Sequence, residues 1–351
     1  MKKVAILTIT NSGMNFGNRL QNYALQEAIR KSGAEVKTIR SAKSLKNSLA
    51  LSKGRRLVKA VVKHSKRRSI YHEFENTYID YDNKIRFENV NESEFADRYD
   101  AFVAGSDQVW NPNFHFNSDF EFASFAPEEK RFSYAASVGV SDITDEQRPA
   151  FVKNLKGMQK ISVREADSVG LVERLIGVKP MLHIDPTMLL DAEEYCRMEK
   201  KPDYDMPERY LFMYYLGNIS DEYKAKVRQI ADSKGLKIIK FTETPGEPFY
   251  NIGPQHFLYL IHHADYICTD SFHGCVFSIL FGKKFAIFTR QDADVPMNSR
   301  IETLVGTFDL NERLVGNLEG DYFKEIDYDA VYSVLGEKRK EAYTYLKSIC
   351  D

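Results

Sequence analysis

The sequence has few cysteines, little glycine and proline, no excess charge and no long apolar run. Its 351 residues include four Cys, which are too few for a disulfide framework and suit a reducing compartment. The 19 Gly and 11 Pro exclude a collagenous or low-complexity chain. Lys and Arg (49) balance Asp and Glu (50), so we expect no nucleic-acid partner. No apolar run reaches the ~18 residues that a membrane span needs.

The chain begins with a Lys pair and a short apolar run that stops at Asn11. Such a run is too short for the apolar part of a signal peptide and is typical of a buried strand. We therefore expect a cytoplasmic protein.

The length favours two domains, at roughly 150 residues per domain. Apolar runs alternate with helical patterns in two blocks, separated by a polar segment with two prolines at 196–209. This alternation predicts an α/β fold of two doubly wound, Rossmann-like domains. We expect an N-terminal domain over 1–200, a C-terminal domain over 201–327, and a helix over 328–351 that can pack back on the N-terminal domain.

The apolar runs and the helical periodicity also predict individual elements. Strands are expected over 4–9, 35–39, 100–104, 131–136, 159–163, 181–184, 211–216, 237–241, 265–268 and 285–288, and helices over 20–29, 221–233, 254–263, 272–281 and 328–350.

Ligands of such sheets bind beyond the carboxyl ends of the strands, so the turns there hold the candidate residues. The first turn contains Asn15, Gly17 and Asn18 and opens a helix. Its backbone N–H groups favour an anion or a sugar hydroxyl. A plain tight turn with Asn caps explains the same residues equally well.

The second turn, Gly105–Pro112, contains Ser106, Asp107, Gln108 and the only Trp of the chain, Trp110. An aromatic face beside carboxylate and amide groups is what a sugar site needs. The alternative is an Asx-turn in which Trp110 fills the core.

A third turn carries Arg164, whose planar guanidinium can bind a carboxylate or phosphate. A structural salt bridge to Glu165 or Asp167 is the alternative.

The fourth turn precedes the helix that starts at Phe272. Asp270 or Ser271 can cap this helix, which places His273 in its first turn, where the positive end of the helix favours an anion and the imidazole can exchange a proton. Gly274 follows in the same turn. Arg300, in a later turn, can supply a second cation.

One stretch, with His262, His263, Cys268, His273 and Cys275, invites a zinc assignment. However, adjacent His residues point to different helix faces and no C-x-x-C pair is present, so core thiols are favoured over a metal site. Neither Cys has the surroundings of a nucleophile. We expect no metal and no organic cofactor.

With these turns in order, the chain resembles the polysaccharide pyruvyl transferase family. The resemblance rests on six motifs that lie in the expected order: NFGNRLQNYAL (15–25), GSDQVWNP (105–112), SYAASVG (133–139), SVRE (162–165), DPTMLL (185–190) and TDSFHG (269–274).

The resemblance implies a two-domain fold similar to that of B-type glycosyltransferases. It also implies an enzyme that transfers pyruvate from phosphoenolpyruvate onto a sugar of a cell-surface polysaccharide or exopolysaccharide, as a cyclic ketal. The acceptor is expected on the N-terminal domain and the donor on the C-terminal one. The family's donor-site Arg maps onto Arg164 and its catalytic His onto His273. Many members carry Arg where this chain has Ser271, and Arg300 or Arg290 is the candidate replacement.

The resemblance and the turns together predict a role for each residue. His273 is expected to act as the general acid or to hold the leaving phosphate, and Asp107 to position or deprotonate the acceptor hydroxyl. The remaining candidates are expected to bind substrate: Asn15, Gly17, Asn18, Ser106, Gln108, Trp110, Ser271, Phe272, Gly274 and Arg300.

Two alternatives stay open. One is a glycosyltransferase of the same fold that uses a nucleotide-sugar donor. The other is a catalytically silent partner in polysaccharide assembly.

The segment Lys53–Arg68 is locally basic, with no acidic residue, and carries a narrow apolar stripe at helical spacing. One interpretation is a helix that packs this stripe on the N-terminal domain. The other is an interfacial helix that holds the enzyme at the inner face of the membrane, near a lipid-linked acceptor.

Overall fold

The computed structural model describes residues 1–10, 13–40, 66–82, 92–114, 119–289, 299–317 and 323–351. Contacts between residues divide it into two units. Unit 1 consists of Met1–Leu190 and Lys338–Asp351, and unit 2 of Asp191–Glu337. The segment 196–209, which the sequence predicted as a linker, therefore lies inside unit 2. No helix among the described residues is long and apolar enough to cross a bilayer.

Unit 1 is built on a parallel sheet in which β1 is central. Val4 of β1 pairs with Val36 of β2 on one side and with Ala101 of β3 on the other, and β3 pairs with β4. Bridges from β4 and the turn after it reach the β5–β6 pair, which extends the order to β2-β1-β3-β4-β5-β6. The strands are Lys3–Leu7 (β1), Glu35–Ile39 (β2), Ala101–Ala104 (β3), Arg131–Ser133 (β4), Ser162–Val163 (β5) and Met181–Leu182 (β6).

This strand order places a switch point between β1 and β3. After β1 the chain continues to β2 on one side of this pair, and after β3 it continues to β4 on the other side. The two connections therefore separate, which opens a crevice at the carboxyl ends of β1 and β3. Both strands are buried along nearly their whole length, as expected for a parallel sheet with both faces covered. The crevice is therefore fixed by a rigid core.

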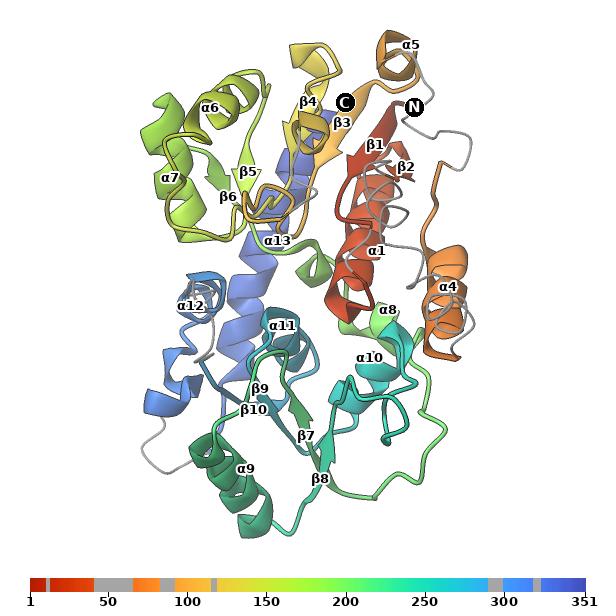
Figure 1. The fold of residues 1–351 in the computed structure, drawn as a ribbon, viewed down its shortest axis with the longest axis vertical. Coiled ribbons are helices and arrows are strands. Elements are labelled where there is room, and N and C mark those ends of the chain that lie inside the picture. Colours follow the sequence, from red (N-terminus) through yellow and green to blue (C-terminus); the bar gives the residue numbers. More distant parts are fainter. Residues whose placement is uncertain (11–12, 41–65, 83–91, 115–118, 290–298, 318–322) are drawn as a thin grey trace, which may run out of the picture. The chain divides into compact units, whose positions relative to one another are not determined.

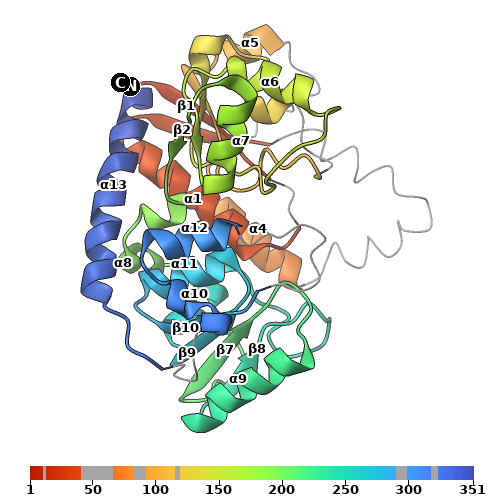
Figure 2. The same cartoon turned by 90° about the vertical axis from the view of Figure 1, so that its left-hand side faces the viewer.

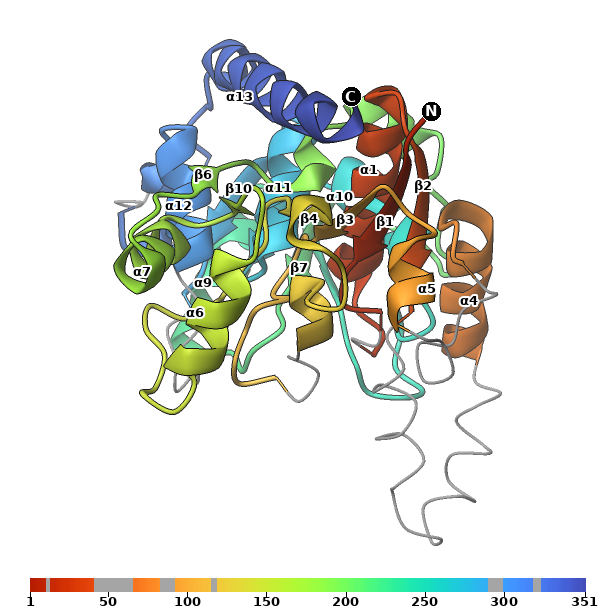
Figure 3. The same cartoon turned by 90° about the horizontal axis from the view of Figure 1, so that it is seen from above.

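Helices cover the sheet of unit 1. In Figure 3, α6 and α7 lie side by side, and they pack against each other. The ring of Tyr23 in α1 meets the ring of Tyr78 in α4 edge to face. The helices are Phe16–Lys31 (α1), Lys66–Tyr78 (α4), Glu92–Ala96 (α5), Arg148–Lys156 (α6) and Ala166–Ile176 (α7).

Unit 2 repeats the same plan. Its parallel sheet has the order β8-β7-β9-β10, so its switch point lies between β7 and β9. Helix α9 packs on β7 and β8, and α11 packs on β9 and β10 (Figure 1). The elements are Ala192–Cys196 (α8), Tyr210–Tyr214 (β7), Asp221–Ser233 (α9), Lys237–Lys240 (β8), Pro254–His262 (α10), Tyr266–Thr269 (β9), Phe272–Leu280 (α11), Lys284–Ile287 (β10) and Ser299–Thr307 (α12).

The last helix, α13 (Tyr328–Cys350), belongs to both units. Near its start, the hydroxyl of Tyr328 donates to the Lys283 carbonyl of unit 2. Near its end, the hydroxyl of Tyr345 donates to the Ser133 carbonyl of unit 1 at 2.7 Å. The Lys2 ammonium donates to the carbonyl of Ile349, so the two termini lie together on unit 1 (Figure 2).

The segment predicted as a basic helix over Lys53–Arg68 lies outside the described residues, except for its last three, which begin α4. Of these, Arg67 is buried, so its charge is not on a solvated face.

A buried histidine in unit 1 makes its stability depend on pH. His183 lies between Tyr134 and Tyr345, and its Nδ1 is 2.7 Å from the Ser162 hydroxyl oxygen. Burial lowers the pKa of His183 to about 4. Because the unfolded chain binds this proton at about pH 6.5, stability is fully present above that pH and is lost as the pH falls toward 4. The expected loss is about 3 kcal/mol.

The measurement is urea unfolding at several pH values between 4 and 7.5, followed by fluorescence of Trp110. This is the only Trp of the chain, and its ring is buried in unit 1. His183→Gln should flatten the pH dependence, whereas His72→Gln, at an exposed position of α4, should keep it. Equal slopes in His183→Gln and wild type would contradict the assignment.

Candidate functional site

The turns at the switch point of unit 1 are tied together by buried polar side chains. The Gln21 amide donates to the Thr8 hydroxyl at 3.0 Å, and its oxygen accepts the N–H of Ser106 at 3.1 Å. The Thr8 hydroxyl donates to the Ser106 carbonyl at 3.1 Å. The turn after β3 is thereby fixed to the turn after β1. Ser106 itself is fully buried, so its contribution is to the structure of this turn.

Asp107 follows at the mouth of the switch point. Its Oδ2 accepts a hydrogen bond from the Asn18 amide at 3.2 Å, and its side chain is 13% exposed. The backbone φ is 67°, a left-handed conformation that Asp tolerates better than most residues. Gly105 is required nearby, because a Cβ there would lie 2.3 Å from the Tyr134 carbonyl oxygen. The chain thus holds one partly accessible carboxylate where ligands of such sheets bind.

Arg164 is enclosed behind this carboxylate. Its guanidinium lies 2.6 Å from Asp185 Oδ2 and 3.4 Å from Asp107 Oδ1, and its side chain is 1% exposed. Burial acts to lower the pKa of Arg164, but Asp185, Asp107 and Glu165 together hold it above its ordinary value. The guanidinium is therefore a permanent cation whose partners are carboxylates of unit 1.

This arrangement corrects the sequence-based role of Arg164. It was predicted to present its guanidinium to a donor anion, with a salt bridge to Glu165 or Asp167 as the alternative. The structure instead pairs it with Asp185 and Asp107, and only more distantly, at 4.0 Å, with Glu165. Arg164 thus lies behind Asp107 and pairs with its carboxylate.

Asp185 is the residue of this cluster that sequence reasoning did not assign. One of its oxygens accepts from the N–H and the hydroxyl of Thr187, at 3.0 and 2.6 Å, and the other meets Arg164. The Asp-Pro-Thr sequence indicates the local turn, and the structure shows this capping. The pairing with Arg164 joins the ends of two strands, and no local pattern could have indicated it.

Two candidates in the second turn belong to the core. Trp110 has no exposed surface, stacks on Phe122 with ring centroids 5.0 Å apart, and donates its indole N–H to the Glu121 carbonyl at 3.0 Å. It cannot offer a face to a sugar, so the prediction of a sugar platform was wrong and the core-filling alternative holds. Gln108 is also buried, and its amide oxygen accepts from Asn111 at 2.6 Å.

The first turn serves mainly to start α1. The side chain of Asn15 accepts the N–H of Asn18 at 3.0 Å and so caps the helix, as the alternative interpretation predicted. Gly17 is buried within the first turn of α1. Of the three candidates in this turn, the structure therefore brings only Asn18 to the Asp107 carboxylate.

The switch point of unit 2 is fixed in a similar way. Asp270, after β9, accepts the backbone N–H groups of Leu216 and Gly217, after β7, at 2.8 and 2.9 Å. Ser271 caps α11 by accepting the N–H of Gly274, as predicted. His273 lies in the first turn of this helix and is 8% exposed. Its imidazole is therefore held at the positive end of α11.

The residues that flank His273 in the chain have packing roles, and the candidate cation Arg300 lies on the adjoining helix. A Cβ at Gly274 would lie 2.4 Å from the Thr269 hydroxyl, so this glycine permits the close approach of α11 to β9. Phe272 meets the His273 ring edge to face, with centroids 5.3 Å apart. Arg300 is in the first turn of α12, which packs against α11. Arg290, the other candidate cation, lies outside the described residues.

Unit 2 also contains a pocket of about 680 Å³ at the ends of β7 and β8. Gly217 lines it, which places it beside the turn that Asp270 holds. Lys224, Arg228 and Lys240 line it as well and give it a basic wall. Sequence reasoning missed this pocket, because its cations are spread over a helix and a strand with no common motif.

The buried thiols of unit 2 are not nucleophiles. Cys268 and Cys275 have no exposed surface, and burial raises the pKa of both. They are core residues, as the sequence indicated.

The family model of polysaccharide pyruvyl transferases matches residues 15–292 of this chain. No curated protein matches it. Among solved structures, UDP-GlcNAc 2-epimerase from Neisseria meningitidis bound to UDP-GlcNAc is similar, with a TM-score of 0.51 at 11% identity over 99% of this chain and 100% of the other. The Methanocaldococcus jannaschii UDP-GlcNAc 2-epimerase has a TM-score of 0.48 at 13% identity over 97% of this chain and 94% of the other. E. coli heptosyltransferase II has a TM-score of 0.38 at 11% identity over 97% of this chain and 99% of the other.

The family match confirms the resemblance drawn from the six motifs. The similarity to the Neisseria meningitidis structure supports the predicted fold class. The fold is a two-domain, Rossmann-like α/β fold of the glycosyltransferase B type.

Proposed function

Because the chain belongs to the polysaccharide pyruvyl transferase family, we propose that it transfers pyruvate from phosphoenolpyruvate onto a saccharide and releases phosphate. Forming a ketal requires protonation of the enol carbon, attack of a sugar hydroxyl at C2, loss of phosphate and closure by a second hydroxyl. The reaction needs a proton donor, a group that orients or deprotonates hydroxyls, and cationic or N–H groups that meet phosphate. It needs no redox partner.

The observation that carries the proposal is the held carboxylate of Asp107. It stands at the switch point of unit 1, fixed by Asn18 on one side and by the permanent cation Arg164 on the other. A carboxylate in a defined position can accept a hydroxyl proton or align the hydroxyl for attack. We assign the saccharide acceptor to this place.

His273 is the proposed acid. It lies at the positive end of α11, where a phosphate is favoured and where an imidazole can give up a proton. The Ser271 hydroxyl is used as the helix cap, so it does not replace the Arg that many family members carry there. We propose Arg300, on the adjoining α12, as the replacement cation.

The test is phosphate release from phosphoenolpyruvate by the purified protein with saccharide acceptors, including lipid-linked ones. The proposal predicts release that depends on both the protein and an acceptor, with gain of a pyruvyl ketal on the acceptor. Transfer of sugar from a nucleotide sugar, with phosphoenolpyruvate left intact, would support a glycosyltransferase instead. If neither reaction occurs with the native polysaccharide precursor, the chain is a silent assembly partner.

A further inference from the structure

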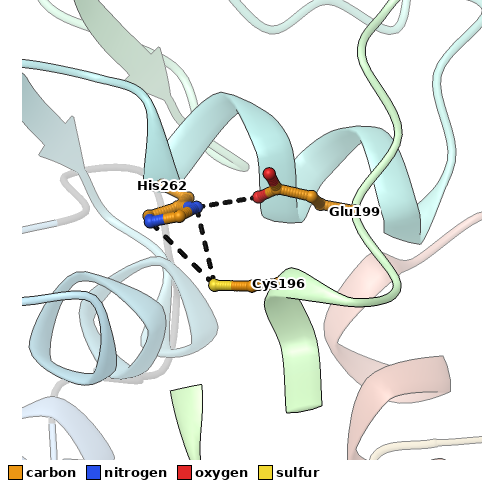
Figure 4. A group of neighbouring side chains, drawn as sticks. All are labelled: Cys196, Glu199 and His262. Atoms are coloured by element: carbon orange, nitrogen blue, oxygen red, sulfur yellow. Dashed lines mark hydrogen bonds and ion pairs between the residues drawn. The ribbon is translucent and has the colours of Figure 1, made fainter. Parts of the chain in front are cut away.

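A cluster of metal-ligating side chains lies in unit 2. Its residues do not belong to the turns that follow β7 and β9 at the switch point of this unit. Cys196 is the last residue of α8, Glu199 follows one helical turn later, and His262 ends α10. Their ligand atoms all lie within 4.8 Å of one another (Figure 4). Thiolate, carboxylate and imidazole are the donors that zinc takes in proteins.

The local structure brings these three donors to one point. The N–H of Glu199 bonds to the Tyr195 carbonyl at 3.1 Å, so the helical turn continues past α8 and places positions 196 and 199 on one face. Gln255 of α10 donates to the Met198 carbonyl at 2.9 Å, and its own carbonyl accepts the N–H of Lys200. The backbone that carries Glu199 is thereby attached to α10.

The distances fit a tetrahedral ion. Bonds of 2.0–2.3 Å put neighbouring ligand atoms about 3.3–3.8 Å apart. The Cys196 sulfur is 3.6 Å from His262 Nδ1, which meets this value, and 3.9 Å from Nε2, so the ring must turn to direct Nδ1 at the ion. Glu199 Oε2 is 2.8 Å from the same nitrogen, so the two must separate by about half an ångström when an ion replaces their hydrogen bond.

The surroundings hold the ligands in place. The His262 ring stacks on Phe281 with centroids 4.8 Å apart. The second oxygen of Glu199 lies 2.9 Å from His263 Nε2, which leaves Oε2 directed at His262. An outer partner of this kind orients a ligating carboxylate. The His262 side chain is 34% exposed, so solvent can reach the site and supply a fourth ligand.

We propose that Cys196, Glu199 and His262 bind a zinc ion that clips α8 to α10. Binding releases the thiol proton of Cys196 to solvent and replaces the Glu199–His262 hydrogen bond with two metal bonds. The proposal changes the sequence-based expectation of no metal. That expectation weighed the stretch with His262, His263, Cys268, His273 and Cys275. It did not weigh Cys196 and Glu199, which lie far from this stretch in the sequence. The site is independent of the proposed transfer reaction.

The test is a calorimetric titration of the untagged, reduced full chain with Zn²⁺. Elemental analysis of the purified protein then gives the number of bound ions. We expect one tightly held Zn²⁺ per chain, a higher unfolding temperature with Zn²⁺, and a thiolate-to-metal absorption band when Co²⁺ replaces it. Cys196→Ser and His262→Gln should each weaken binding at least tenfold and remove the band or reduce it. His263→Gln should weaken binding by about 10–100-fold and keep the band.

Matched controls are Cys350→Ser, at another thiol, and His72→Gln, at an exposed histidine outside the cluster. Both should bind Zn²⁺ as wild type does. Wild type that binds no Zn²⁺, or binding that is unchanged in Cys196→Ser and His262→Gln, would overturn the proposal and leave an ion-paired cluster only.

Discussion

Replacing His273 with Ala is expected to lower the turnover number of the transfer reaction by about 10²–10⁴-fold. The imidazole lies in the first turn of α11, at the end of β9. If it donates the proton in the transition state, KM for phosphoenolpyruvate should change little. Steady-state phosphate release over a range of donor concentrations measures both constants.

The fold must be checked in the same variant, because His273 is largely buried. Its unfolding temperature should stay close to that of wild type, and His273→Gln should be equally inactive, since glutamine fills the space without titrating. His72→Ala, on α4 of unit 1, serves as a control with normal turnover. A folded His273→Ala protein with near wild-type turnover would remove His273 from the mechanism.

Replacing Arg164 with Ala is expected to destabilise unit 1 by about 3–5 kcal/mol. The change leaves the carboxylate of Asp185, which has no exposed surface, without the cation that compensates its burial. It also releases Asp107, so the remaining folded enzyme should have low activity. Urea unfolding followed by the fluorescence of Trp110 reports this loss, because the indole is in the core of unit 1.

Two further variants separate this cause from a general loss of packing. Adding Asp185→Asn to Arg164→Ala should recover part of the stability, since it removes the uncompensated charge. Arg174→Ala, at an exposed arginine that donates to the Ser141 carbonyl, should have little effect. Equal stability of wild type and Arg164→Ala would show that Arg164 does not neutralise this cluster.

Local sequence signals predicted elements well where caps and periodicity agree. The helices at Asp221–Ser233 and Tyr328–Cys350 and the strand at Glu35–Ile39 were predicted with the bounds that the structure has. Ser220, for example, caps α9 through the N–H of Tyr223. Several strands were predicted too long. The strand expected over 131–136, for example, ends at Ser133 in the structure.

The site was predicted only as far as local rules reach. The cap at Ser271 and the place of His273 follow from the sequence, because a helix start is a local pattern. The pairing of Arg164 with Asp185, and the cluster of Cys196 with His262, join residues that only the tertiary fold brings together. Trp110 shows the opposite error, since an aromatic beside polar residues has the same sequence pattern whether it is exposed or buried.

Mass spectrometry of the native polysaccharide tests the central claim most directly. It compares cells that contain this protein with cells that lack it and with cells that contain His273→Ala. The account predicts a pyruvyl ketal on the polysaccharide of the first cells and its absence from the other two. A polysaccharide of identical mass and composition in all three would contradict pyruvyl transfer by this chain.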